Sequence, residues 1–151
     1  MTLYDLLNEG SSALQQAGDT DAENDAKLLL LTAFDLNLVH FLMDRLRPLS
    51  ETDAAVQEQI QNYHAMVAKR ASRVPLQQIL GSQEFMGLDF QVSEDVLVPR
   101  QDTEVLVEEA LKYVHSGMKL LDMCTGSGCI LLSIVKLAAE LKGCREVTGT
   151  G

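Results

Sequence analysis

Residues 120–132, "LLDMCTGSGCILL", restrict the possible fold more than any other stretch of the chain. A short apolar run meets an acid, Asp122, and then a loop of small residues and a second apolar run. This order is typical of a buried parallel strand that turns tightly into a helix. The sequence therefore predicts a strand over Met118–Met123 and a helix over Gly128–Leu141, with a loop between them that can hold a ligand.

The chemistry of that loop leaves three interpretations open. Unpaired N–H groups at a helix start attract polar and anionic groups, and Gly126 and Gly128 let a ligand approach the backbone. A dinucleotide fingerprint needs a third glycine where Leu131 stands, and Asp122 would repel a pyrophosphate. An acid here suits a cationic amino group, such as that of S-adenosylmethionine. The loop alone is compatible with a methyltransferase, a dinucleotide enzyme or a structural turn.

A second strand, predicted over Arg145–Thr150, would complete one βαβ unit. A doubly wound sheet needs several such units, and a lone pair of parallel strands leaves edges unpaired and one face bare. We therefore expect residues from about 98 onward to begin a larger domain, and the chain to be truncated at its C-terminal side.

The first seventy-odd residues show helical periodicity. We expect helices over Thr2–Ala17, from a capping box at Thr20–Glu23 onward, over Val39–Arg45, and from Ser50–Asp53 to a point before Pro75. The last helix has one apolar face, formed by Val56, Ile60, Tyr63 and Val67. These patterns predict a small antiparallel helical bundle over residues 1–73.

The pattern changes at Pro75. Glycines at 81 and 87 and alternating apolar residues predict a β-hairpin linker over residues 74–97. After Pro99 we expect another amphipathic helix, capped by Asp102 or Thr103, with Gly117 at its end.

Charge and composition exclude several classes of function. The net charge of −10 argues against direct binding of nucleic acid. Three cysteines without framework spacing or a nearby histidine favour free thiols in a reducing compartment over a disulfide scaffold or a metal site. There is no signal peptide and no apolar run of about 20 residues, so we expect a soluble, cytoplasmic protein with no membrane partner.

The connector carries a more specific signal than the glycine loop. "PLQQILGSQEFMGLDFQVSEDVLVPRQDTEVLVEEAL", residues 75–111, together with "LLDMCTGSGCI" and the upstream "DAKLLL", resembles the HemK/PrmC family. The resemblance spans essentially the whole chain. It implies S-adenosylmethionine-dependent methylation of the glutamine in the GGQ motif of peptide chain release factors, which supports translation termination. A related enzyme that methylates a ribosomal-protein glutamine shares much of this pattern and is an alternative.

The resemblance also implies an architecture and a site. The expected fold is an α-helical N-terminal bundle that helps recognise the release factor, a β-hairpin linker, and the start of an α/β Rossmann-like class I methyltransferase domain over residues 98–151. The implied cofactor-binding residues are Asp122, Cys124, Thr125, Gly126, Ser127 and Gly128. Cys124 stands where many members have glycine.

Arg100 and Glu104 lie in "VPRQDTE" and are candidates for the substrate side of the site, with helix capping as the alternative. The family's Asn-Pro-Pro-Tyr amide pocket is absent, because Pro48, Pro75 and Pro99 are isolated, and the ribose-binding acid falls at Gly151. We therefore expect no catalytic residue in this chain and no activity of the chain alone. A non-catalytic helical module that docks a release factor is the alternative.

Overall fold

The chain folds into two units, Met1–Leu80 and Gly81–Gly151. The structure is a computed structural model that describes residues 1–50 and 52–151. Glu51, in the predicted helix start at Ser50–Asp53, lies outside the described residues. Each unit has its own hydrophobic core, and each is described by itself.

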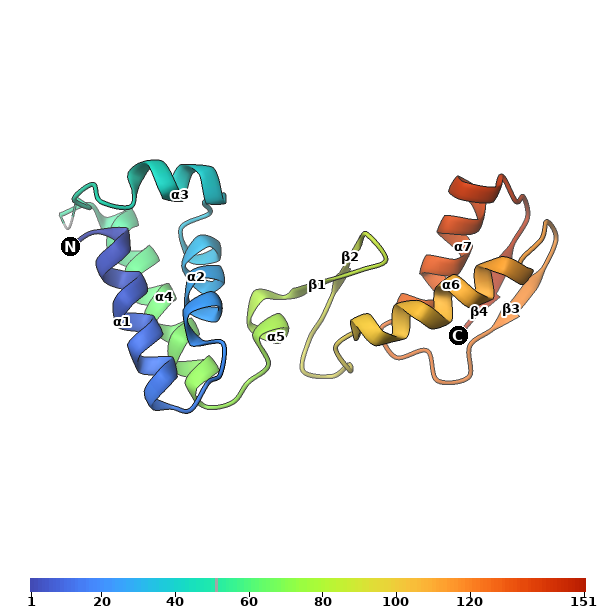
Figure 1. The fold of residues 1–151 in the computed structure, drawn as a ribbon, viewed down its shortest axis with the longest axis horizontal. Helices are drawn as coiled ribbons and strands as arrows, with labels where there is room; N and C mark the ends of the chain where they lie inside the picture. Colours follow the sequence, from blue (N-terminus) through green and yellow to red (C-terminus); the bar gives the residue numbers. More distant parts are fainter. Residues whose placement is uncertain (51) are drawn as a thin grey trace. The chain divides into compact units, whose positions relative to one another are not determined.

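The Met1–Leu80 unit is helical. Its elements are α1 (Leu3–Gln16), α2 (Ala22–Ala33), α3 (Leu38–Asp44), α4 (Ala54–Ala71) and α5 (Leu76–Leu80). Helices α1, α2 and α4 lie side by side, and α3 crosses one end of them (Figure 1). The core is almost entirely aliphatic, with Leu6, Leu14, Leu29 and Leu30 fully enclosed. The predicted helical bundle is confirmed, with α1 and α3 within one residue of their expected bounds.

The first two helices begin differently. Thr2 caps α1 through a reciprocal capping box: its hydroxyl accepts from the N–H of Asp5 at 3.1 Å, and the Asp5 carboxylate accepts from the N–H of Thr2 at 2.8 Å. The predicted capping box at Thr20–Glu23 is wrong, because α2 starts after Asp21 with no side-chain cap. The carboxylate of Asp19 accepts the N–H of Asp21 at 3.1 Å, so a local turn takes the place of the box.

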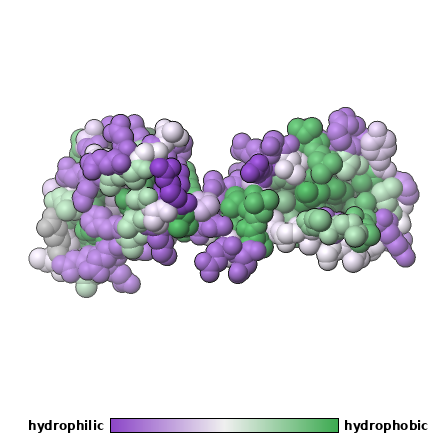
Figure 2. All heavy atoms as spheres, turned by 90° about the horizontal axis from the view of Figure 1, so that it is seen from below, coloured by the Kyte–Doolittle hydropathy of each residue, from purple (hydrophilic) through white to green (hydrophobic). Residues whose placement is uncertain are grey.

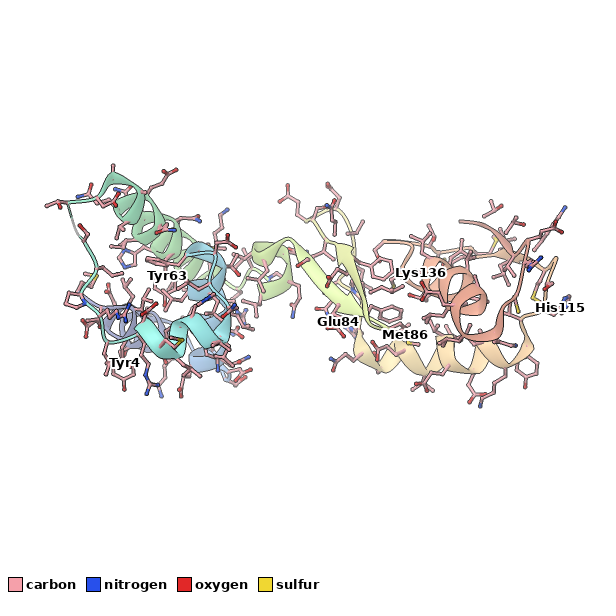
Figure 3. The ribbon with its side chains drawn as sticks, turned by 90° about the horizontal axis from the view of Figure 1, so that it is seen from above. Tyr4, Tyr63, Glu84, Met86, His115 and Lys136 are labelled. Atoms are coloured by element: carbon pink, nitrogen blue, oxygen red, sulfur yellow. The ribbon has the colours of Figure 1, made fainter. Side chains whose placement is uncertain are left out.

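Polar contacts of α4 join the helices of this unit. The Tyr63 hydroxyl, fully buried, donates to the carbonyl of Leu6 at 3.1 Å, and Gly10 lets α1 approach that ring. Tyr63 points from α4 into the bundle (Figure 3). The Arg70 guanidinium on α4 binds the carboxylates of Asp25 at 2.6 Å and Asp19 at 2.8 Å. Burial raises the pKa of Asp25, and the charge of Arg70 opposes that rise.

A short helix precedes the hairpin. Residues 76–80, predicted as part of the hairpin linker, form α5 instead. Pro75 fits the first turn of a helix, and its carbonyl accepts the N–H groups of Gln78 and Ile79. Leu76 is buried in the core of the helical unit.

The hairpin pairs β1 (Ser82–Phe85) with antiparallel β2 (Leu88–Gln91), in register with Phe85 opposite Leu88. Its two turn residues, Met86 and Gly87, have φ of +55° and +72°. Two positive φ angles identify a type I′ turn, the tight turn that matches the twist of the strands. The predicted hairpin is therefore present, although it begins later than expected.

The remaining elements are a 3₁₀ helix η1 (Gln101–Thr103), α6 (Glu104–Tyr113), β3 (Lys119–Leu121), α7 (Cys129–Lys142) and β4 (Thr148–Thr150). Strands β3 and β4 are parallel, so the predicted βαβ unit is present. The predicted side-chain caps of α6 at Asp102 or Thr103 are wrong. Instead η1 runs directly into α6, and the N–H of Thr103 donates to the carbonyl of Arg100.

The prediction that the first parallel strand is buried is also wrong. Leu120 packs on the core of the unit, whereas Lys119 and Leu121 are exposed, Leu121 by 68%. In the described chain β4 alone pairs with β3, so the second edge of β3 has no partner strand there. Figure 2 shows broad apolar areas on the Gly81–Gly151 unit, whose exposed large apolar side chains are Leu97, Val105, Leu106, Tyr113, Leu121, Met123, Leu132 and Leu141.

Among the described residues no single helix is long and apolar enough to cross a membrane. Helices α2 and α3 reach that length and composition only as a pair, and they are bent by 94° relative to each other.

Candidate functional site

The loop between β3 and α7 is folded by its own hydrogen bonds. The N–H of Asp122 continues the parallel ladder by donating to Thr150 at 2.9 Å. Oδ1 of Asp122 accepts from the N–H of Cys124 at 3.3 Å, and the N–H of Gly128 donates to the carbonyl of Thr125 at 2.7 Å. The loop therefore has a defined path from the strand into the helix.

Both glycines of the loop adopt left-handed backbone conformations, with φ of +51° at Gly126 and +77° at Gly128. A methyl group at Gly126 would meet only the carbonyl of Cys124, at 4.0 Å, so the backbone there is uncovered. Gly128 precedes α7 without supplying a side-chain cap. The first N–H groups of a 14-residue helix thus begin at the loop, where the helix dipole favours a negative group.

A cavity of about 210 Å³ joins this loop to the segment before α6. One side is formed by Cys124, Thr125, Gly126 and Ser127 with the start of α7, and the other by residues 97–100 with Thr103. The structure therefore brings Arg100, predicted from "VPRQDTE", together with four residues of the predicted cofactor loop. Asp122, Gly128 and Glu104 do not line this cavity.

Asp122 carries an unused acceptor. Its Oδ2 is buried and has no hydrogen-bond partner among the described residues. A buried carboxylate oxygen without a donor is unfavourable, and a cationic or N–H group brought by a ligand would satisfy it. The acid, the uncovered backbone at Gly126 and the helix start together fit a ligand with both an ammonium and a carboxylate, the charged groups of a methionine moiety.

Glu104 has a different position from the one expected. Its Oε1 accepts the N–H of Met86 at 2.7 Å, which ties the start of α6 to the turn of the β1–β2 hairpin. Figure 3 shows Met86 at that turn. The sequence pattern around Glu104 did not predict this contact. The only signal for it was "MG" at residues 86–87, where a tight turn leaves an N–H without a partner in the strand ladder.

The end of β4 lies against the same loop. A side chain at Gly151 would begin 2.5 Å from the hydroxyl of Thr125. Position 151, which the sequence analysis aligned with a ribose-binding acid, is therefore next to the glycine loop. With Thr125 in its present rotamer only glycine fits there.

The three cysteines are free thiols, with Cys124 exposed, Cys129 buried and Cys144 half-buried. Cys124 and Cys129 both line the cavity.

A model of the PrmC N-terminal domain family matches residues 5–81, about half of the chain. The chain belongs to the HemK/PrmC family. The match coincides with the Met1–Leu80 unit and extends one residue beyond it. The helical bundle is thus the part of this chain that corresponds to that domain.

Curated relatives extend the similarity through the second unit. The release factor glutamine methyltransferase of Geobacter sulfurreducens is 39% identical over 135 residues, which are 89% of this chain and 45% of that protein. The enzymes of the same name from Clostridium acetobutylicum and Bifidobacterium longum are 33% and 38% identical, over 94% and 89% of this chain. The chain spans about half the length of these relatives, at 45–48% of each.

Proposed function

We propose that the chain belongs to an S-adenosylmethionine-dependent methyltransferase that modifies the side-chain amide of the GGQ glutamine in peptide chain release factors. The proposal assigns the helical unit Met1–Leu80 to release-factor recognition, residues 81–97 to a linker and residues 98–151 to the start of a Rossmann-like cofactor domain. The observation that carries it is the 210 Å³ cavity, where the glycine loop and the Val98–Arg100 segment meet. The names of the curated relatives support the same activity.

The residues present suit the methionine half of the cofactor. Asp122 offers an unpaired carboxylate oxygen for an ammonium group, and the N–H groups at the start of α7 offer donors for a carboxylate. Leu97, Val98 and Ile130 give the cavity apolar walls. S-adenosylmethionine, when bound, supplies a methyl group on a sulfonium, which is transferred by in-line displacement.

The amide side of the reaction needs other residues. An amide nitrogen is a weak nucleophile because its lone pair is delocalised, so acceptors must orient it and draw on its N–H groups. Residues 1–151 contain no Asn-Pro-Pro-Tyr sequence. We therefore assign to this chain the binding of the methionine moiety and no step of the transfer itself.

Binding is tested by titrating the ¹⁵N-labelled chain with S-adenosylmethionine and, separately, with NAD⁺. We expect weak binding of S-adenosylmethionine that shifts the amides of Cys124–Gly128 and Arg100, and a smaller response to NAD⁺ because Asp122 repels a pyrophosphate. Asp122→Asn should weaken the response, with Asp102→Asn as the exposed control. No shift of these amides at about 1 mM ligand would exclude even millimolar affinity and overturn the proposal.

A further inference from the structure

Leu97, Val98 and Pro99 form a part of the cavity wall that is connected to the rest of the unit through the chain segments on either side of it. In the described chain, residues 93–99 make no hydrogen bond to any other part of the protein, and the one recorded within them joins the N–H of Asp95 to the Ser93 hydroxyl. On the N-terminal side the segment follows Phe90 and Val92, which are buried. Its position therefore depends on the packing of Pro99, which is buried, and on how firmly these flanking parts are fixed.

Glu104 joins the two flanks of this wall. It begins α6, one residue after Thr103, which lines the cavity, and its carboxylate accepts the N–H of Met86 across 18 residues of sequence. The loop closed by this hydrogen bond contains every wall residue from Leu97 to Arg100. Because closing a loop restricts all the residues within it, breaking this hydrogen bond would increase the mobility of the hairpin turn and of the wall together.

The donor is well suited to this role. Met86 is the first residue of a type I′ turn, so its N–H points away from the strand ladder and has no partner there. A charged acceptor forms a stronger hydrogen bond than a neutral one, and this bond is partly shielded from water. The hydrogen bond to the carboxylate also offsets the strain of holding Met86, which is not a glycine, at φ +55°.

We propose that Glu104 is a positioning residue, which acts through the Met86 N–H to hold the wall of the cavity in place rather than by touching a ligand. This inference deepens the proposed function, since it rests on the cavity being the cofactor site. It changes the role of Glu104 from substrate contact to support of Leu97–Arg100.

The hydrogen bond is first tested in the unmodified chain by amide hydrogen exchange. We expect the Met86 amide to be protected although it lies outside the ladder, because Glu104 is its acceptor. Exchange of Met86 at the rate of an unprotected amide would overturn the proposal without any variant being made.

The effect on the wall is tested by trypsin cleavage of the Arg100–Gln101 bond, read by mass spectrometry. Glu104→Ala should increase cleavage at this bond about tenfold, since a hydrogen bond to a charged group is lost and local opening increases accordingly. Glu104→Gln keeps a weaker, neutral acceptor, so its cleavage rate should lie between those of the unmodified chain and of Glu104→Ala. Because both variants lack the charge, their comparison controls for the effect of charge on the protease. Glu108→Ala, exposed on the same helix, should change nothing.

Titration with S-adenosylmethionine separates the two proposals. Glu104→Ala should weaken binding and Glu104→Gln should restore it in part, at unchanged thermal unfolding of the rest of the unit. If the unmodified chain binds no S-adenosylmethionine, the cofactor assignment fails while exchange and cleavage still decide the role of Glu104. Equal cleavage of the Ala and Gln variants would overturn the positioning role even if the cofactor binds.

Discussion

At the scale of single residues, the Arg70 cluster is the feature of the helical unit most sensitive to substitution. The Arg70 side chain is 21% exposed, while those of its partners Asp19 and Asp25 are 8% and 7% exposed. Removing one partner of a buried ion pair leaves the other charge unpaired in the interior. We expect Arg70→Gln to destabilise the helical unit by about 2–4 kcal/mol, the lower value reflecting partial exposure. Arg47→Gln, which breaks an exposed pair with Asp44, is the control and should cost about 0.5 kcal/mol or less.

The effect of Arg70→Gln should depend on pH. Burial already raises the pKa of Asp25, and losing the Arg70 charge raises it further. A carboxyl whose pKa is higher in the folded state contributes stability at low pH and loses it as pH rises through that pKa. The difference in free energy of unfolding between Arg70→Gln and the unmodified protein should therefore become smaller as the pH falls from about 7 to about 4.5. Urea unfolding followed by circular dichroism measures this difference. A gap that widens on acidification would contradict this assignment.

Replacing Gly10 with alanine has two opposing effects on the stability of the helical unit. Replacing a helical glycine with alanine gains about 1 kcal/mol from propensity. A methyl group at this position, however, would overlap the Tyr63 hydroxyl, and overpacking a core costs about 1–3 kcal/mol or more. We expect Gly10→Ala to be net destabilising in thermal unfolding. Tyr63→Phe removes the most crowded atom, so the double variant should lose less than the sum of the single variants.

Residue roles were only partly predictable from the sequence. Arg100 and the Cys124–Ser127 loop were predicted from segments that resemble those of a known family, and both line one cavity. The bonds of Arg70 to Asp25 and of Glu104 to Met86 join residues 45 and 18 positions apart. Such contacts are set by the packing of whole elements, and no local pattern encodes them.

At the scale of elements, β3 allows its two faces to be compared directly. Leu120 packs on the core and Leu121 is exposed. We expect Leu120→Ala to destabilise the unit by about 1–3 kcal/mol, because the side chain is only half-buried, and Leu121→Ala to change stability by about 0.5 kcal/mol or less. Urea unfolding of the two variants measures this difference. Equal losses would mean that both faces of the strand are covered in solution.

Element types were more predictable than their ends and burial. Periodicity correctly indicated the helices α1, α3, α4, α6 and α7, the hairpin and the parallel strands. It missed α5 because five residues are too few to show a helical period. It overstated the burial of β3. An apolar run indicates that a strand can be buried, but it does not show which neighbouring elements cover the strand.

At the scale of the whole molecule, the two units differ in how completely they enclose their apolar residues. The helical unit encloses a continuous core that includes the fully buried Leu6, Leu29 and Tyr63. The Gly81–Gly151 unit has a smaller buried core. Both units leave large apolar side chains in solvent, the first on α3 and the second on α6, β3 and α7. Because domains of this size are marginally stable, the fraction of apolar surface that each encloses determines whether it folds by itself.

We therefore expect residues 1–80 to fold without the rest of the chain. A fragment ending at Leu80 keeps α5, whose Leu76 belongs to the helical core, whereas a fragment ending at Ser72 loses it. The longer fragment should show cooperative thermal unfolding by circular dichroism at the midpoint of the helical unit in the intact chain. The shorter fragment should unfold at lower temperature, since it exposes the Leu76 site and removes the Val74 carbonyl that accepts a hydrogen bond from Arg70. If the fragment ending at Leu80 were unfolded, the helical unit would need residues beyond its own core, and the ion-pair cluster would not suffice to hold α2 and α4 together.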